Sequence, residues 1–224
     1  MPIASVVSSH YKKKKKMERL IIFIALLLAF FSTSEIKAQS DNLQPARGIF
    51  DCYDFQFEYY SKIRKVLFKD LNDSPEIRFL VLPSFTPESV LDIQFDRNNE
   101  KYYLVFHICE KMIWYNETWE QTNVRKTRKE ITKESVELIK KLFETAIYKS
   151  KHSEELLIVS DGTNYYFSIH NKTGTVWSPS EGSKMGRLVN IGQKLIQLIN
   201  SDNELVEFDD NFKENIIRLT TEIK

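Results

Sequence analysis

The chain has 224 residues, of which 42% are hydrophobic and 28% are charged, and its formal net charge at pH 7 is +1. Two cysteines are too few for a zinc site of the multi-cysteine kind. The sequence also contains no H-E-x-x-H motif, no C-x-x-C pair and no EF-hand loop. We therefore expect neither a metal site nor a cofactor.

The first 38 residues have the order of a secretory signal peptide. A basic region, Lys12–Lys16 and Arg19, precedes the apolar run Leu20–Phe31, and Ser32–Ala38 lead to a cleavage point after Ala38. The apolar run is about a dozen residues long, whereas a membrane span needs roughly 20. We expect cleavage and a soluble periplasmic or secreted bacterial protein, with a retained membrane anchor as the alternative.

The charge of the exported chain differs from that of the whole chain. With translation from Met1, residues 1–38 carry seven basic and two acidic side chains, which leaves 25 basic and 29 acidic side chains and a net charge of −4. Met17 is an alternative start, since the run after it is a compact signal by itself. Nucleic-acid binding depends on phosphate neutralisation, so we expect no nucleic-acid partner, and membrane contact only during export.

Behind the signal we expect a leader over residues 39–50 and a single domain over residues 51–224. Gln39–Gly48 is polar and lacks periodicity, which predicts a flexible segment. Cys52 and Cys109 are an even pair, which favours a disulfide in an oxidising compartment. Loop closure would make that disulfide worth about 4 kcal/mol. The alternative is two buried thiols.

Strand-like segments dominate the first half of the domain. Near-helical spacing predicts a helix over Tyr59–Leu71, and a strand over Tyr53–Tyr59 is the alternative. Strands are predicted, in chain order, over Ile77–Leu82, Val90–Phe95, Lys101–Cys109 and Thr118–Lys129. The third is apolar on both faces, as in a covered central strand, and the fourth is charged like an edge strand.

Two clear helices organise the second half. Thr132 is predicted to cap the first, which has an apolar stripe from Val136 to Ile147. Asp161-Gly162 lies between two apolar runs and predicts a β-hairpin. The remaining predictions, in chain order, are strands over Leu156–Val159 and Tyr165–Ile169, a turn at Asn171–Gly174, a strand over Thr175–Trp177, and helices over Met185–Ile199 and Phe212–Thr220.

Together these elements predict an α+β fold. Strands grouped in meanders, with helices between the groups, are typical of an antiparallel sheet of hairpins with three to four helices packed mainly on one face. A regular βαβ alternation is missing, which argues against a doubly wound fold. A domain of this length can bury one sizeable core.

Residues 174–186, GTVWSPSEGSKMG, join a strand to a helix. A nucleotide-binding P-loop needs G-x-x-x-x-G-K-[ST], but Trp177 stands five residues before Gly182, and the following Ser and Lys are in reverse order. We predict that Ser180 or Ser183 caps the helix. The backbone N–H groups at such a cap can bind a small anion. Trp177 is therefore a candidate binding residue beside Ser180 and Ser183.

A second candidate surface follows the third predicted strand. Trp114 and Trp119 lie close together in the sequence and can form a patch for glycan stacking or protein binding. Core packing is the alternative for Trp114. The basic stretch Arg125–Lys129 is predicted to be a charged edge strand, with contact to an anionic glycan or an acidic partner as the alternative.

Catalytic residues cannot be assigned from this sequence. His107 and His170 lack a nucleophile at hydrogen-bonding distance in the sequence pattern, and no G-x-S-x-G motif is present. We therefore expect an exported, non-enzymatic protein that acts through a protein or glycan contact in the bacterial envelope. One alternative is an immunity or inhibitor protein against an envelope-acting toxin. The other is an unrecognised glycan or peptide hydrolase.

Overall fold

A computed structural model describes residues 41–46, 54–114, 116–152 and 161–224, with side chains from Phe57 onward in the first helix. The expected signal peptide, Cys52 and the strand predicted over Leu156–Val159 lie outside these residues. None of the described helices is long and apolar enough to cross a membrane.

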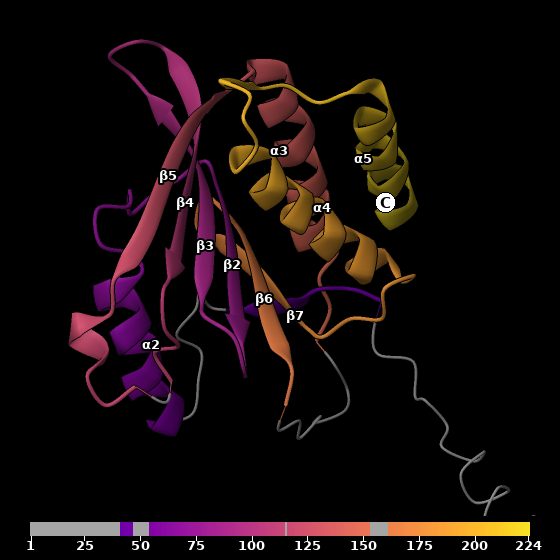
Figure 1. Ribbon diagram of the computed structural model, residues 1–224. Coiled ribbons are helices and arrows are strands. Elements are labelled where there is room, and N and C mark those ends of the chain that lie inside the picture. The colour runs from indigo at the N-terminus through magenta and orange to yellow at the C-terminus, as the bar shows by residue number, and fades with distance from the viewer. Residues whose placement is uncertain (1–40, 47–53, 115, 153–160) are drawn as a thin grey trace, which may run out of the picture. The chain divides into compact units, whose positions relative to one another are not determined.

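Eight strands form one sheet in the order β1-β7-β6-β2-β3-β4-β5-β8 (Figure 1). The strands are β1 (Gln44–Ala46), β2 (Ile77–Pro83), β3 (Ser89–Asp96), β4 (Lys101–Cys109), β5 (Val124–Ile131), β6 (Thr163–Ile169), β7 (Lys172–Trp177) and β8 (Leu205–Val206). Neighbouring strands are antiparallel, except that β8 runs parallel to β5 at two residue pairs. The predicted α+β class is confirmed.

The helices divide unequally between the two faces of the sheet (Figure 1). Helices α3 (Lys133–Tyr148), α4 (Lys184–Ile199) and α5 (Asp210–Ile223) pack on one face, which we call the three-helix face. Helix α2 (Asp54–Val66) packs alone on the other, the α2 face. Alternation along each strand separates the two sets of side chains: Phe79 and Phe167 point to the first core, Leu80 and Tyr166 to the second.

The helix starts agree with the sequence pattern. The Thr132 side chain accepts from the Ser135 N–H, and the Ser183 side chain accepts from the Gly186 N–H. Asp209 plays the same part for α5. The strand alternative for the start of the first helix is wrong, because α2 is helical from Asp54.

The N-terminal segment differs from the expected flexible leader. Residues 44–46 form β1, which pairs with β7. Leu43 is fully buried, and it fills space that Gly174 leaves: a Cβ there would lie 2.7 Å from Leu43 Cδ1. The Lys151 N–H also donates to the Leu43 carbonyl at 2.8 Å. This polar segment is therefore held on the domain by one buried apolar side chain and by pairing with β7.

Three smaller differences concern the strands. The turn between β6 and β7 is His170-Asn171, not Asn171–Gly174, and His170 takes a left-handed φ of 51°. Strand β5 is an edge over most of its length, since β8 pairs only with Glu130 and Ile131. Strand β4 is covered incompletely on both faces, since Tyr102 and Ile108 are half-buried on the three-helix face and Tyr103 and Val105 on the α2 face.

A candidate binding surface along helix α2

Helix α2 and the segment Glu110–Asn123 form a continuous surface at the lower left of Figure 1, which we call the α2–loop surface. The segment links β4 to β5 and contains a short 3-10 helix, η1 (Trp119–Gln121), which contacts α2. Both partners rest on a small apolar cluster that includes Tyr60, Ile63, Leu67 and Ile113. This surface brings Trp114 and Trp119, two of the predicted site residues, next to one helix.

A buried carboxylate ties the two halves of this surface together. Glu88 is fully buried. It accepts hydrogen bonds from the Tyr59 hydroxyl of α2 at 2.9 Å and from the Ile113 N–H of the segment at 2.9 and 3.1 Å. Burial raises the pKa of the Glu88 carboxyl, and the hydrogen bonds from Ile113 and Tyr59 oppose that rise. Glu88 is therefore an internal clamp between helix and segment.

Tyr59, which is hydrogen-bonded to Glu88, also positions Trp114. Its indole packs edge-on against the Tyr59 ring with centroids 4.5 Å apart, and the side chain is still 43% exposed. Burial, with Glu88 nearby, raises the pKa of the Tyr59 hydroxyl, which stays protonated as the hydrogen-bond donor. Core packing does not account for Trp114, because a large part of its ring faces solvent.

Cys109 lies beside Glu88 with its side chain buried. Burial raises the pKa of its thiol to about 12. Cys52 lies outside the described residues, and the Cys52–Cys109 disulfide stays a prediction.

Further up the same face, two more ionisable groups are buried inside the fold. His107 bonds through Nδ1 to the Leu67 carbonyl at 2.9 Å, which requires a proton on Nδ1, and burial lowers its pKa. Asp92 is fully buried and accepts from Arg78 Nε and Nη2, each at 2.7 Å. Burial raises the pKa of Asp92, and Arg78 opposes that rise. Arg78 also donates to the Asn72 carbonyl, so the pair fastens the connection after α2 to the sheet.

The segment is braced by its own side chains. Asn116 Nδ2 donates to the Thr122 hydroxyl at 2.7 Å, and Asn116 Oδ1 accepts from the Thr118 N–H at 3.0 Å. At the ends of the segment, the Glu110 N–H donates to the Asn123 carbonyl, and Asn123 Nδ2 donates to the Glu110 carboxylate. These bonds fix the position of Trp119 between them before any ligand arrives.

A hollow of about 410 Å³ opens between the end of α2, the braced segment and β5. We call it the basic hollow, because Lys65, Lys69 and Lys126 line it against one acidic side chain, Glu120. Its other lining residues are Val66, Trp119, Thr122, Asn123 and Val124. Its position makes the C-terminal end of α2 a locally cationic surface.

The contacts within the basic hollow leave cationic charge available. Lys126 pairs with Asp70 at 2.6 Å and lowers the pKa of that carboxyl. Lys62 and Lys65 place their Nζ atoms 5.8 and 5.7 Å from the centroid of the Trp119 ring. That distance is near the outer limit of a cation–π contact. Lys69 makes no ion pair with any described residue.

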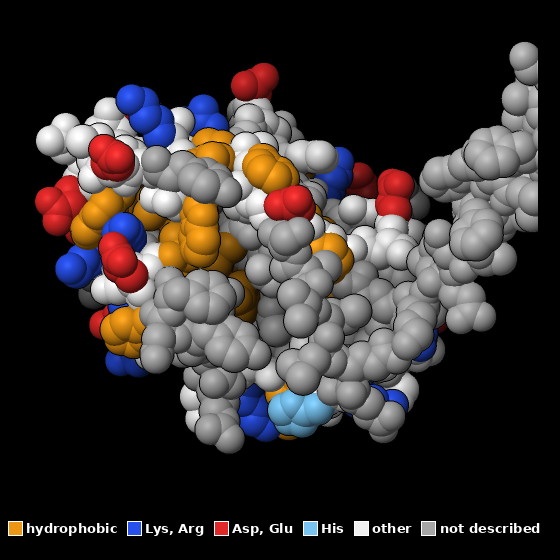
Figure 2. Space-filling model, turned by 90° about the horizontal axis from the view of Figure 1, so that it is seen from below, with side chains coloured by type: hydrophobic (Ala, Val, Ile, Leu, Met, Phe, Trp, Pro, Cys, Tyr) orange, Lys and Arg blue, Asp and Glu red, His pale blue; other side chains and the backbone are white. Residues whose placement is uncertain are grey.

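Exposed aromatic side chains lie at the N-terminal end of α2. In the view from below, hydrophobic side chains are exposed on the side where α2 lies, with charged side chains around them (Figure 2). Phe57 of α2 is 64% exposed, and Trp114, which packs against Tyr59 two residues further along α2, is 43% exposed. The α2–loop surface therefore has an aromatic end at the start of α2 and the basic hollow at the end of α2.

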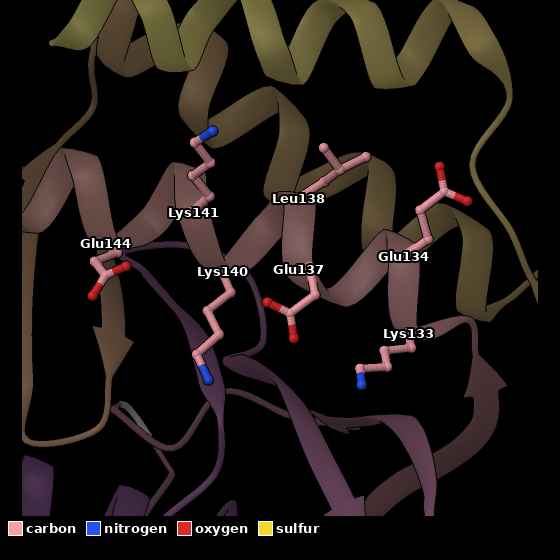
Figure 3. A pocket seen from close by; sticks show the side chains of 7 residues that line it. All are labelled: Lys133, Glu134, Glu137, Leu138, Lys140, Lys141 and Glu144. Atoms are coloured by element: carbon pink, nitrogen blue, oxygen red, sulfur yellow. The ribbon is translucent and has the colours of Figure 1, made fainter.

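A larger hollow, of about 640 Å³, lies along the flank of α3 and has none of these properties (Figure 3). All its lining residues belong to one helix: Lys133, Glu134, Glu137, Leu138, Lys140, Lys141 and Glu144. Three lysines and three glutamates balance one another, and two of them pair outward, Lys140 with Glu76 and Glu134 with Lys213. This hollow has no charge preference and no aromatic side chain.

The remaining predicted site residues lie elsewhere. Trp177 ends β7, and four strands separate β7 from β5 beside the basic hollow. Its indole packs over Gly162, where a Cβ would come within 2.5 Å of the ring. Ser180 is exposed, and its carbonyl accepts from the Ser183 hydroxyl. Trp177, Ser180 and Ser183 line neither of the two hollows.

The predicted anion site at the start of α4 is filled by the protein itself. The Ser183 hydroxyl accepts from the Gly186 N–H at 2.9 Å, and the Asp41 carboxylate accepts from the Met185 N–H at 3.1 Å. A carboxylate at a helix N-terminus is favoured by the helix dipole. Asp41 thus takes the place that an external anion would need.

The buried ionisable groups are engaged by the protein itself and are not part of either hollow. Glu88, Asp92 and His107 each contact the protein's own donors or acceptors, and none lines either hollow. Among the described residues, no three His, Cys, Asp or Glu side chains form a cluster able to hold a metal ion.

Comparison with protein-family models, with curated proteins and with solved structures yields no match.

Sequence reasoning missed the residues that build this surface. Lys65 and Lys69 carry no local signal, because they meet Lys126 only after α2 folds against β5. Glu88 also carries no local signal, because its partners Tyr59 and Ile113 are 29 and 25 residues away in the sequence. Of the basic stretch Arg125–Lys129, Lys126 lines the basic hollow.

Proposed function

We propose that this is an exported, non-enzymatic binding protein that holds an anionic partner in the basic hollow. The observation that carries the proposal is that Lys65 and Lys69, from α2 and the residues after it, line one hollow with Trp119 and with Lys126 of β5. Cationic side chains around an aromatic ring are a recurrent arrangement for ligands that combine charge with a flat surface.

Charge contrast supports an anionic partner over a cationic one. Three lysines and one glutamate line the basic hollow, and Asp70 pairs with one of the lysines, Lys126, so that one net positive charge remains there, whereas the exported chain has a net charge of −4. A local concentration of positive charge on an acidic protein steers an anion to one place on its surface. A volume of about 410 Å³ also lies in the range of small-ligand sites.

The test is a calorimetric titration with dextran sulfate, and with neutral dextran of the same length as the control. We expect saturable binding of dextran sulfate alone, weakened by rising salt. The double variant Lys65→Ala/Lys69→Ala should weaken binding on the order of tenfold, since each exposed pair contributes up to about 1 kcal/mol.

A matched variant guards against a nonspecific charge effect. Lys133→Ala/Lys141→Ala removes the same charge from the balanced hollow on α3 and should leave the affinity unchanged. Equal losses in both double variants, or no binding of dextran sulfate, would contradict the proposal.

A second candidate function is favoured by the aromatic end of the α2–loop surface. Phe57 and Trp114 are large, exposed and near the start of α2, and aromatic side chains of this kind are enriched at protein interfaces. An immunity or inhibitor protein would use them to dock a toxin. In that case Trp114→Ala and Phe57→Ala would abolish protection of cells against the toxin, while Lys65→Ala/Lys69→Ala would not.

A further inference from the structure

We infer that the ligand of the basic hollow is an acidic saccharide, and that Trp119 is the platform for its sugar ring. This inference rests on the proposed function and names its ligand class. Three features of the hollow carry it: the fixed indole, the spacing of charge around the indole, and the polar side chains at its rim.

The indole is held in place by the fold. Trp119 begins η1, whose ends are fixed by the Asn116–Thr122 and Glu110–Asn123 bonds, and the Thr122 N–H donates to the Trp119 carbonyl at 3.0 Å. The side chain is half-buried, so part of the ring stays open. A rigid aromatic surface suits a ligand with a flat apolar face, since little order is lost on binding.

The cations come from more than one element. Lys65 of α2 has its Nζ 5.7 Å from the centroid of the Trp119 ring, Lys69 follows the helix, and Lys126 of β5, which is paired with Asp70, lines the same hollow. A compact anion such as phosphate would need the lysines alone and gain nothing from the indole. Charged groups attached to the edge of a ring would meet the lysines while the ring covers Trp119.

The rim adds hydrogen-bonding groups suited to hydroxyls. The Thr122 hydroxyl accepts from Asn116 and still has its own proton to donate. Asn123 uses Nδ2 for Glu110, while its Oδ1 accepts no hydrogen bond from the described residues. A donor and an acceptor beside an aromatic surface match the alternating hydroxyls of a sugar better than the plain methylenes of an acidic side chain.

The test compares ligands of similar charge. Affinities are measured by calorimetry for tetragalacturonate, for tetraglutamate and for adenosine triphosphate, with maltotetraose as the uncharged sugar. We expect tetragalacturonate to bind at least about fivefold more tightly than tetraglutamate or the nucleotide, because the uronate carries its carboxylates on the rings that cover Trp119, whereas tetraglutamate has no ring and the nucleotide carries its charge on a chain at one end, away from its base. Maltotetraose should not bind measurably.

The platform is then tested by Trp119→Ala, with Trp114→Ala as the matched control, because Trp114 lies in the same segment but outside the hollow. Trp119→Ala should weaken tetragalacturonate binding about tenfold and leave tetraglutamate binding within about twofold. Thermal unfolding of both variants checks that the fold persists.

Two results would overturn the inference and differ from each other. In the first result, tetraglutamate or adenosine triphosphate binds as tightly as tetragalacturonate or more tightly, and Trp119→Ala does not change the ratio of these affinities. This result would reject an acidic saccharide as the ligand but leave the proposed anion binding intact. Failure of every anion to bind the intact protein would remove the proposed function itself.

Discussion

The two faces of the sheet bury different kinds of side chain. On the three-helix face, α3, α4 and α5 cover side chains that are almost all apolar, among them Phe79, Phe143 and Phe167, whose rings contact one another. On the α2 face a single helix covers a smaller apolar cluster, and Glu88, Asp92 and His107 are buried beside it. The first face gives the domain its stability, and the second uses buried polar groups to position a surface.

Removing a ring from the three-helix face should give the largest effect. Phe167 is fully buried between Phe79 and Phe143, with both ring centroids 5.0 Å away. Phe167→Ala should lower the free energy of unfolding by about 4 kcal/mol, as large core truncations do. Urea denaturation measures it. A loss below about 1 kcal/mol would contradict the assignment of the main core to this face.

The buried ion pair gives the next effect and separates stability from positioning. Asp92→Ala leaves Arg78 without its carboxylate and should cost about 3 kcal/mol. The double variant Arg78→Met/Asp92→Leu removes both charges and should recover most of that loss. If the double variant is less stable than Asp92→Ala alone, the ion pair itself stabilises the fold. The α2 face would then contribute to stability as well as to the position of the surface.

The smallest effect concerns Glu88 and depends on pH. Its pKa is raised in the fold, so the protonated form is favoured there. The stabilisation it gives is complete below the unfolded pKa of about 4.3 and decreases as the pH rises through the folded value. Glu88→Gln cannot titrate. The difference in unfolding free energy between wild type and Glu88→Gln should therefore shift toward the variant as the pH rises from 4 to 7.

Urea unfolding at several pH values measures that difference, and other titrating groups cancel because both proteins share them. A difference that shifts toward the wild type as the pH rises would mean that the hydrogen bonds from Tyr59 and Ile113 outweigh burial at this carboxyl.

The fold was largely predictable because it follows local patterns. Short β-rich apolar runs marked β2, β3, β4 and β6, and helical stripes with a capping residue marked α3 and α4. The docking of Leu43 was not predictable, because it depends on the space left by Gly174 far along the chain. The polar composition of residues 39–48 predicts a segment that is unstructured by itself. It gives no information about the space beside Gly174 that receives the Leu43 side chain.

The candidate site was less predictable than the fold. Trp114 and Trp119 were marked by their side chains and have kept part of their surface exposed. The basic stretch that contains Lys126 was noted, but its meeting with Lys65 could not be predicted, since the two lysines are 61 residues apart in the sequence and come together only in the folded chain. Trp177 and the serines after it drew attention through a motif-like spacing that the structure uses for a helix cap. Charge gathered by tertiary contacts leaves no short motif.

The central claim is that the α2–loop surface serves binding while the three-helix face serves stability. The most direct measurement is a dextran sulfate titration of Lys65→Ala/Lys69→Ala alongside its urea denaturation. The account predicts an affinity loss on the order of tenfold with an unfolding free energy within about 0.5 kcal/mol of wild type. An unchanged affinity, or a loss of affinity that accompanies a comparable loss of stability, would contradict it.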